Sequence, residues 1–187
     1  MSDKKFVHLH VHSHYSLLDG LGKPEDYVKK AVEHGSPAVA LTDHGVMHGS
    51  IEFFKACKKH DIKPIVGCEV YVAFNKLTDK RHQIDNKRAH MTLLAQTQEG
   101  YENLLKMTTV AHLEGYYYKP RVDWDLLKKH SKGLIALSGC LQGNIPGAIL
   151  NEDSEKTKEL IERFQSTFGK NNFYLEIQSH PSLPQQK

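Results

Sequence analysis

Apolar segments of two different periods alternate along the chain. Short apolar runs without alternation, such as 38–42 and 91–95, are typical of strands buried on both faces. Apolar positions three and four residues apart lie between these runs and predict amphipathic helices. The predicted strands span residues 6–11, 38–42, 63–73, 91–95, 134–137 and 173–177. The predicted helices span residues 24–34, 50–60, 100–112, 123–130 and 154–168.

Residues at the element boundaries support this pattern. Pro24 falls in the first turn of a predicted helix that Gly35 ends, and Asp123 is a suitable N-cap for another. The polar segment 75–87 and the segment 116–121 are expected to be loops. Repeated strand–helix units build a parallel sheet covered by helices, so the pattern predicts an α/β fold. The length favours one domain over residues 1–187.

Composition says more about the cellular environment of the protein than about its function. Of 187 residues, 39% are hydrophobic, which is enough for a core. The net charge of +3 is too small to indicate nucleic-acid binding by bulk charge. The three cysteines are widely spaced, without a CxxC pair, and predict a reduced, cytoplasmic setting. No signal-peptide core and no apolar stretch of membrane-spanning length is expected.

Four histidines alternate near the start of the chain, where residues 8–14 have the sequence HLHVHSH. Alternate side chains of a strand share one face, so His10 and His12 are expected to converge on one point. Neutral imidazoles are common metal ligands. The alternative, a histidine-rich tail or tag, is less favoured because Leu9 and Val11 are interleaved with the histidines.

Further candidate ligands follow or lie within the predicted strands. Chemistry collects at the carboxyl ends of parallel strands, which brings distant positions together. Asp43 and His44 follow one strand, and Glu69 lies in another that is otherwise apolar. A carboxylate there is paired or metal-bound, unless it faces outward in a salt bridge. His90 opens its strand, whereas Cys140 follows the 134–137 strand. Mixed donors of this kind suit zinc or a similar divalent ion.

Some of these residues have ordinary alternative explanations. Asp19 precedes a glycine and could be a turn residue, and Cys140 could be a small buried hydrophobe. Tyr116–Tyr118 beside Lys119 and Arg121 could stack bases and hold phosphates, although an amphipathic loop packed on the fold is favoured. The chain has no nucleophile elbow, no Walker A loop, no dinucleotide-binding fingerprint and no HExxH motif.

Four segments together resemble the PHP (polymerase and histidinol phosphatase) domain family. They are residues 8–20, 40–45, 63–69 and 134–140. The resemblance is strongest to the PHP domains at the N-terminus of bacterial DNA polymerase III alpha subunits, which segments 100–104 and 119–121 also resemble. It implies a distorted (β/α)7 barrel that binds up to three zinc or manganese ions. The metal-binding and catalytic residues that it implies are His10, His12, Asp19, His44, Glu69, His90 and Cys140.

The resemblance assigns Glu69 as a bridge between two ions and assigns no metal to His8, where many family members have Asp. Family members also carry a final Asp-x-His motif, which this chain lacks. We therefore expect a barrel that is incomplete at its C-terminus and a chain that is part of a longer polymerase. We do not expect His180 to replace a missing ligand.

The resemblance implies metal-dependent hydrolysis of phosphodiesters. The expected activity is that of a 3′–5′ exonuclease that proofreads the primer 3′ end during DNA replication, within a DNA-directed DNA polymerase. The implied partners are DNA, the remainder of the alpha subunit and other replisome subunits, with no membrane. Two alternatives stay open. One is a non-catalytic platform whose metals stabilise the fold. The other is a stand-alone phosphatase that acts on a small phosphate monoester.

Overall fold

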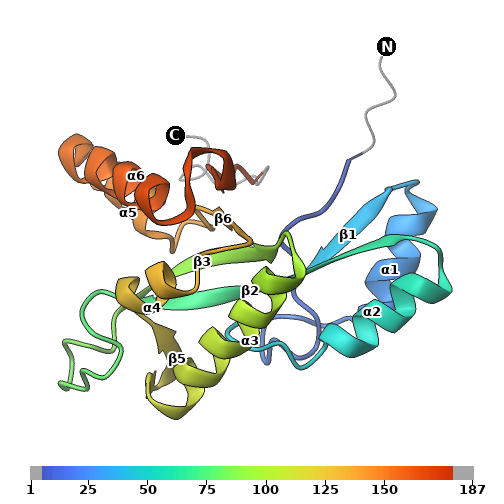
Figure 1. Cartoon of the computed structure of the whole chain (residues 1–187), viewed down its shortest axis with the longest axis horizontal. Helices are drawn as coiled ribbons and strands as arrows, with labels where there is room; N and C mark the ends of the chain where they lie inside the picture. The colour runs from blue at the N-terminus through green and yellow to red at the C-terminus, as the bar shows by residue number, and fades with distance from the viewer. Residues whose placement is uncertain (1–5, 179–187) are drawn as a thin grey trace.

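The long strand β2 (Lys63–Ala73) organises the sheet in the computed structural model, which describes residues 6–178 (Figure 1). The other strands are β1 (Ala38–Leu41), β3 (Arg88–Ala95), β4 (Tyr116–Tyr117), β5 (Lys119–Val122), β6 (Leu134–Leu137) and β7 (Phe173–Tyr174). The helices are α1 (Pro24–Glu33), α2 (Ser50–Lys59), α3 (Gln98–Leu113), α4 (Trp124–Lys129), α5 (Asn144–Leu150), α6 (Ser154–Phe168) and the short 3-10 helix η1 (Lys170–Asn172). The predicted α/β class is confirmed.

The sheet is mixed, so the predicted parallel arrangement holds for only part of it. β2 pairs in parallel with β1 near its start and with β5 near its end, but β3 runs antiparallel to both β2 and β6. β7 is parallel to β6. The cause is the connection from β2 to β3, which is a polar loop without a crossover helix. A parallel return needs such a crossover, whereas a loop returns the chain antiparallel.

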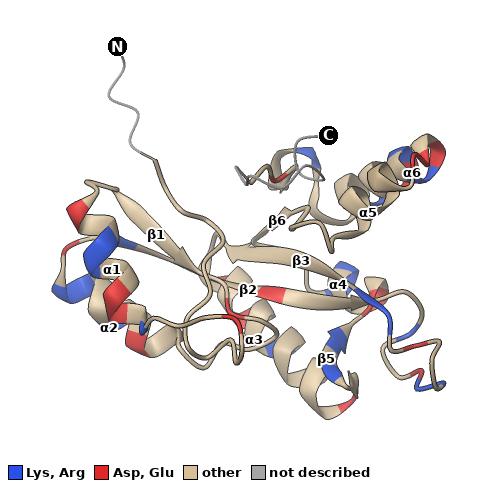
Figure 2. Cartoon of the chain, turned by 180° about the vertical axis from the view of Figure 1, so that it is seen from behind, with Lys and Arg blue, Asp and Glu red and all other residues tan. Residues whose placement is uncertain are grey.

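Two pairs of helices lie at the two ends of the sheet, and α3 packs against its middle strands. α1 and α2 pack together at the β1 end, α5 and α6 pack together at the β6 end, and α3 packs on β3 and β5 (Figure 1). One core cluster includes Val28 of α1 and Phe53 of α2, and a larger one includes Met91, Leu104 and Phe164. Figure 2 shows that charged residues gather on the outer helices and loops, with few in the central strands. None of the described helices is long and apolar enough to cross a bilayer.

The predicted strand over residues 6–11 is wrong, although this segment does run beside β1. Ala40 donates its backbone N–H to the carbonyl of His8 at 2.9 Å, and Thr42 donates to that of Val11 at 2.8 Å. The Val11 N–H bonds to the Thr42 hydroxyl at 2.9 Å instead of to a backbone carbonyl. This side-chain bond interrupts the ladder, so the segment keeps an extended course without forming a regular strand.

Several smaller expectations also differ from the structure. Segment 116–121 forms the hairpin of β4 and β5 rather than a loop, with Tyr118 at its tip. Helix α5 was not predicted, because it is short and contains both Pro146 and Gly147. β7 ends at Tyr174, three residues before the predicted end. The other predicted helices and strands are confirmed to within a few residues. His180 lies outside the described residues.

Arg121 is buried and holds a loop in place, so it is not available to bind a phosphate, as the sequence alone had allowed. Its side chain is 0% exposed and donates to the carbonyl oxygens of Gly115, Asp85, Leu77 and Asp79 at 2.6–3.0 Å. Three of these carbonyls belong to the loop between β2 and β3. The five donors of a guanidinium allow this many simultaneous bonds, so one buried side chain fixes the course of that loop.

Candidate metal centre

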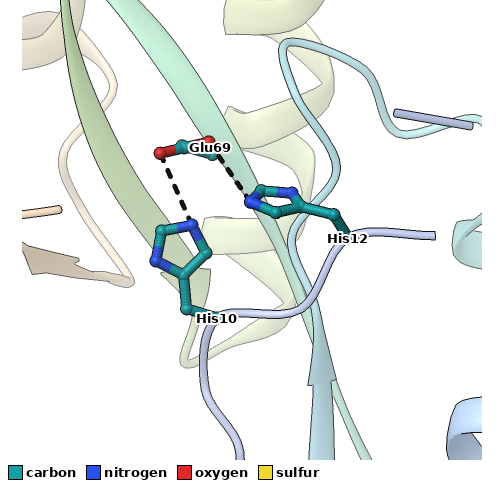
Figure 3. A group of neighbouring side chains, drawn as sticks. All are labelled: His10, His12 and Glu69. Carbon is teal, nitrogen blue, oxygen red and sulfur yellow. Dashed lines mark ion pairs between the residues drawn. The ribbon is translucent and has the colours of Figure 1, made fainter. Parts of the chain in front are cut away.

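A buried carboxylate, Glu69, lies at the centre of a ring of imidazoles. Its side chain is 1% exposed, and Figure 3 shows His10 and His12 turned toward it. Oε1 lies 3.4 Å from Nε2 of His10 and 3.1 Å from Nδ1 of His90. Oε2 lies 3.4 Å from Nε2 of His12 and 2.5 Å from Nδ1 of His44. Four imidazoles from three separate segments of the chain therefore meet at one carboxylate.

Main-chain pairing brings three of these segments together. Glu69 donates its N–H to the carbonyl of Asp43 at 3.1 Å, and Gly45 donates to the carbonyl of Glu69 at 2.8 Å. These bonds continue the β1–β2 pairing and set His44 beside Glu69. His90 pairs with Tyr71 in the β2–β3 ladder. Because β3 is antiparallel, its first residues lie at the same edge as the end of β2, which explains why His90 opens its strand.

Asp43 holds the loop that carries Asp19. Its buried carboxylate accepts hydrogen bonds from Ser13 N–H at 2.6 Å and from the hydroxyls of Ser13 and Ser16, the shortest at 2.7 Å. The loop after residue 12 is thereby folded back over the site. Asp19 Oδ2 then lies 2.6 Å from Nε2 of His44. Asp43 thus stabilises the loop that carries Asp19, while the neighbouring residue His44 belongs to the ring of imidazoles.

Six of the seven expected ligands fall into three groups whose donor atoms lie within 4.8 Å of one another. The groups are His10–His12–Glu69, His12–Asp19–His44 and His44–Glu69–His90. The shared members, His12, His44 and Glu69, join the groups into one cluster. The seventh residue, Cys140, lines the same cavity without joining a group.

The cluster contains buried polar atoms that its own hydrogen bonds leave unsatisfied. Glu69 Oε2, His10 Nε2 and His44 Nδ1 are buried and lie in ion-pair contacts of 2.5–3.4 Å, but within the described part of the chain none of the three has a partner in hydrogen-bond geometry. An unpaired buried polar atom is costly, so these atoms indicate a missing electrophile between them. Imidazole nitrogens and carboxylate oxygens are the donors that zinc, manganese and iron accept. The residues present therefore fit a divalent ion.

Burial and charge set the protonation states of the ring. Burial raises the pKa of Glu69, but its close contacts with the His10, His44 and His90 imidazoles lower it more, to well below its usual range. Burial lowers the pKa of His10, but its contacts with the carboxylates of Glu176 and Glu69 outweigh burial and raise that pKa to about 9. Burial and the charge of His44 lower the pKa of His12 to about 4. At neutral pH His12 is thus neutral, with a lone pair free for a ligand.

Sequence reasoning missed Glu176 as a member of the site. Its Oε1 lies 2.6 Å from Nδ1 of His10, and its N–H donates to the Ser138 hydroxyl at 2.9 Å. A carboxylate on one ring nitrogen fixes the tautomer and aims the other nitrogen at a metal. The available signal was an acidic residue within a predicted strand, the same signal that pointed to Glu69.

The cluster lies in a cavity of about 670 Å³. Leu17, Leu18 and Asp19 line one side, and Tyr71, Arg88, Tyr118 and Lys119 line another. Burial raises the pKa of the Cys140 thiol on the same wall, which disfavours the thiolate. The cavity wall therefore includes aromatic and cationic residues in addition to the histidines and acids of the cluster.

Comparisons with known proteins find similar sequences over nearly the whole chain. The family model described as "PHP domain" matches residues 8–180. DNA polymerase III subunit alpha of Borreliella burgdorferi is 48% identical over 177 residues, covering 94% of this chain and 15% of that protein. The Thermus aquaticus protein of the same name is 43% identical over 190 residues, covering 100% of this chain and 15% of that protein. The chain thus spans about a seventh of the length of these relatives.

Among solved structures, one similar protein shares less of its sequence with this chain. It is a two-domain Bacteroides vulgatus protein containing a predicted PHP-like metal-dependent phosphoesterase, 18% identical over 84% of this chain and 41% of that one, with a TM-score of 0.45.

Proposed function

The chain belongs to the PHP domain family, and from this we propose that it hydrolyses DNA phosphodiesters with divalent ions held around Glu69. We propose further that it is the PHP domain of a bacterial replicative polymerase and removes nucleotides from the primer 3′ end. The likeness to DNA polymerase III subunit alpha supports this setting. The observation that carries the proposal is the convergence of four imidazoles and their unsatisfied atoms on one buried carboxylate.

The three groups of donor atoms supply the candidate positions for the ions. Glu69 belongs to two of the groups and has both oxygens inside the ring, so it would bridge neighbouring ions. When bound, divalent ions lower the pKa of a coordinated water and stabilise charge on phosphoryl oxygens. Zinc and manganese are the ions that the donor set suits best. Cys140 remains an expected ligand from the cavity wall.

The remaining residues orient the ring. Glu176 holds the His10 imidazole by Nδ1, so that Nε2 faces Glu69. Asp43 fixes the loop that brings Asp19 against His44. His12 is neutral at physiological pH and can donate its lone pair without first losing a proton. These contacts preorganise the donors, which is what metal catalysis requires of the protein.

The two cysteines near the site are poorly activated as nucleophiles. Burial raises the pKa of Cys140, so its thiolate is scarce at neutral pH. Cys68 beside Glu69 is fully buried, with a pKa raised by that burial. Hydrolysis by an activated water therefore suits the cavity better than a covalent intermediate on the chain.

The test combines metal analysis with digestion of labelled DNA. The protein is stripped with a chelator, reloaded with zinc or manganese, and analysed for bound metal. It is then incubated with a 5′-labelled single strand, which a 3′–5′ exonuclease shortens one nucleotide at a time. Glu69→Gln and His12→Ala are expected to abolish shortening, whereas His82→Ala, an exposed histidine outside the site, retains it. Metal that raises the melting temperature without any shortening would favour the non-catalytic platform.

A further inference from the structure

Two cations on the cavity wall have no carboxylate partner. Arg88 and Lys119 both line the cavity, and neither lies within 4.0 Å of an acidic oxygen of residues 6–178. The Nε of Arg88 is buried and has no hydrogen-bond partner in that part of the chain. Both cations lie over the Tyr71 ring, with Arg88 Cζ at 5.3 Å and Lys119 Nζ at 5.7 Å from its centroid.

This cationic pair lies one step along the sheet from the candidate metal centre. Glu69 and Tyr71 are two residues apart on β2, and Arg88 and His90 are two apart on β3. Residues at this spacing share a face of the sheet and are roughly 7 Å apart. If ions held near Glu69 and His90 bound one phosphate of a nucleic-acid strand, Arg88 and Lys119 would be available to the neighbouring phosphate of that nucleic-acid strand. Figure 2 shows basic residues on β5 and at the outer end of β3.

Two exposed tyrosines extend the same wall outward. Tyr116 is 52% and Tyr118 60% exposed, and both line the cavity. Tyr118 is the tip of the β4–β5 hairpin and has a φ of 60°. This left-handed conformation is costly for a bulky residue, and such strain clusters at ligand-binding positions. An exposed aromatic ring beside unpaired cations is the combination on which single-stranded bases stack.

We propose that Arg88, Lys119 and Tyr118 form a binding wall for the single-stranded nucleotides next to the bond that is hydrolysed. This inference rests on the proposed function and adds where the strand lies. Arg88 and Lys119 would contact its phosphates, and Tyr118 would stack on a base. An acidic peptide would satisfy the two cations but would give the exposed tyrosine no base to stack on, so a nucleic-acid strand fits the wall better.

The phosphate contacts are tested by binding alone, without turnover. A fluorescein-labelled twelve-nucleotide oligothymidylate is titrated with metal-free protein at several salt concentrations, and anisotropy gives Kd. Arg88→Gln and Lys119→Gln should each weaken binding roughly threefold and reduce the slope of log Kd against log salt by about 0.7. Lys87→Gln removes an exposed charge that does not line the cavity and should change neither quantity.

The stacking contact is tested with an abasic strand of the same length. Tyr118→Ala should weaken oligothymidylate binding about fivefold or more, with no effect on the abasic strand. Tyr174→Ala, another exposed tyrosine away from the cavity, is the matched control. Melting temperatures of all variants should match that of the wild type. Equal losses on both strands would overturn the stacking role.

Failure of the wall and failure of the proposed function give different results. Hydrolysis of bis(p-nitrophenyl) phosphate by metal-loaded protein tests the metal chemistry on a substrate with no neighbouring nucleotide. If that hydrolysis is absent while Arg88→Gln, Lys119→Gln and Tyr118→Ala still weaken binding, the wall stands and the proposed function fails. If the oligonucleotide does not bind, or the three variants bind it like the wild type, the wall is wrong. Polyglutamate that competes as well as the oligonucleotide would also overturn it.

Discussion

Glu176 lies 2.6 Å from the Nδ1 of His10, although 166 residues separate them in the chain. Within residues 6–178 no backbone ladder joins β7 to the segment that carries His10. The two ends of the described chain are therefore linked by side chains at the candidate metal centre itself. Gln178 reinforces the link, because its amide donates to Glu176 at 2.7 Å.

Glu176→Gln should weaken metal binding about 10-fold to 100-fold, because outer carboxylates orient metal-binding imidazoles. His10 would lose an anion that raises its pKa, and its ring would be less firmly aimed at Glu69. Competition with a chromogenic zinc chelator measures the affinity. Glu162→Gln on the exposed face of α6 is the matched control and should bind like the wild type. An unchanged affinity in Glu176→Gln would show that His10 needs no such support.

Glu69→Ala should destabilise the metal-free protein by roughly 3 kcal/mol, because removing one partner from a buried charged network leaves the others uncompensated. His10, His44 and His90 would all lose their ion-pair contacts with the same carboxylate. Urea unfolding followed by circular dichroism gives the free energy of unfolding. A more stable variant would contradict this prediction, because it would show that burying the Glu69 carboxylate costs more free energy than its contacts with the imidazoles recover.

Metal addition should stabilise the folded protein by mass action. At 100 times Kd a ligand that binds only the native state contributes about 2.7 kcal/mol. The melting temperature of chelator-treated protein should therefore rise with added zinc or manganese and fall again with chelator. Glu69→Ala should lose most of this response, whereas His82→Ala should keep it. A response of the same size in both variants would place the ion elsewhere.

Arg121→Lys should release the loop between β2 and β3. Lysine cannot replace the guanidinium bonds to four carbonyls, and unsatisfied buried groups cost about 2 kcal/mol or more. Trypsin should then cut faster after Lys80 or Arg81, as mass spectrometry of the fragments would show. Cutting at the wild-type rate would mean that the Arg81–Asp85 pair, at 2.8 Å, holds the loop alone.

Glu25→Gln should alter acid unfolding. Hydrogen bonds from Lys59 and His60 lower the pKa of Glu25 from 4.5 to about 2. A depressed pKa contributes stability that is present above pH 4.5 and disappears as the pH falls through 2. The variant should therefore be less stable than wild type at neutral pH, with the difference vanishing near pH 2. Circular dichroism across this range provides the measurement, and Glu162→Gln should follow the wild-type curve.

Much of the site could be predicted because its main residues stand next to elements with clear patterns. The alternation of His10 and His12 gave a shared face even though the segment is not a regular strand. Glu69 stood out as a charge in an apolar strand, and the family resemblance supplied Asp19 and Cys140. Their roles as ligands remain predictions.

The rest depended on tertiary pairing, which a local pattern does not encode. The antiparallel course of β3 could not be known from its apolar run, so the position of His90 looked anomalous. Glu176 was missed because its partner lies at the other end of the chain. Arg121 was assigned to an amphipathic loop, because nothing near it in the sequence indicates that its side chain would be buried and donate to four carbonyls.

The link between His10 and Glu176 also orders events during synthesis. A ribosome adding about 5–20 residues per second needs roughly 10–30 s to add Glu176 after it has added His10. Through that interval the early histidines are made but lack the anion that aligns them. A nascent chain can collect metal ions before then, but only a polypeptide that already includes Glu176 can hold them in the arrangement described for the native protein.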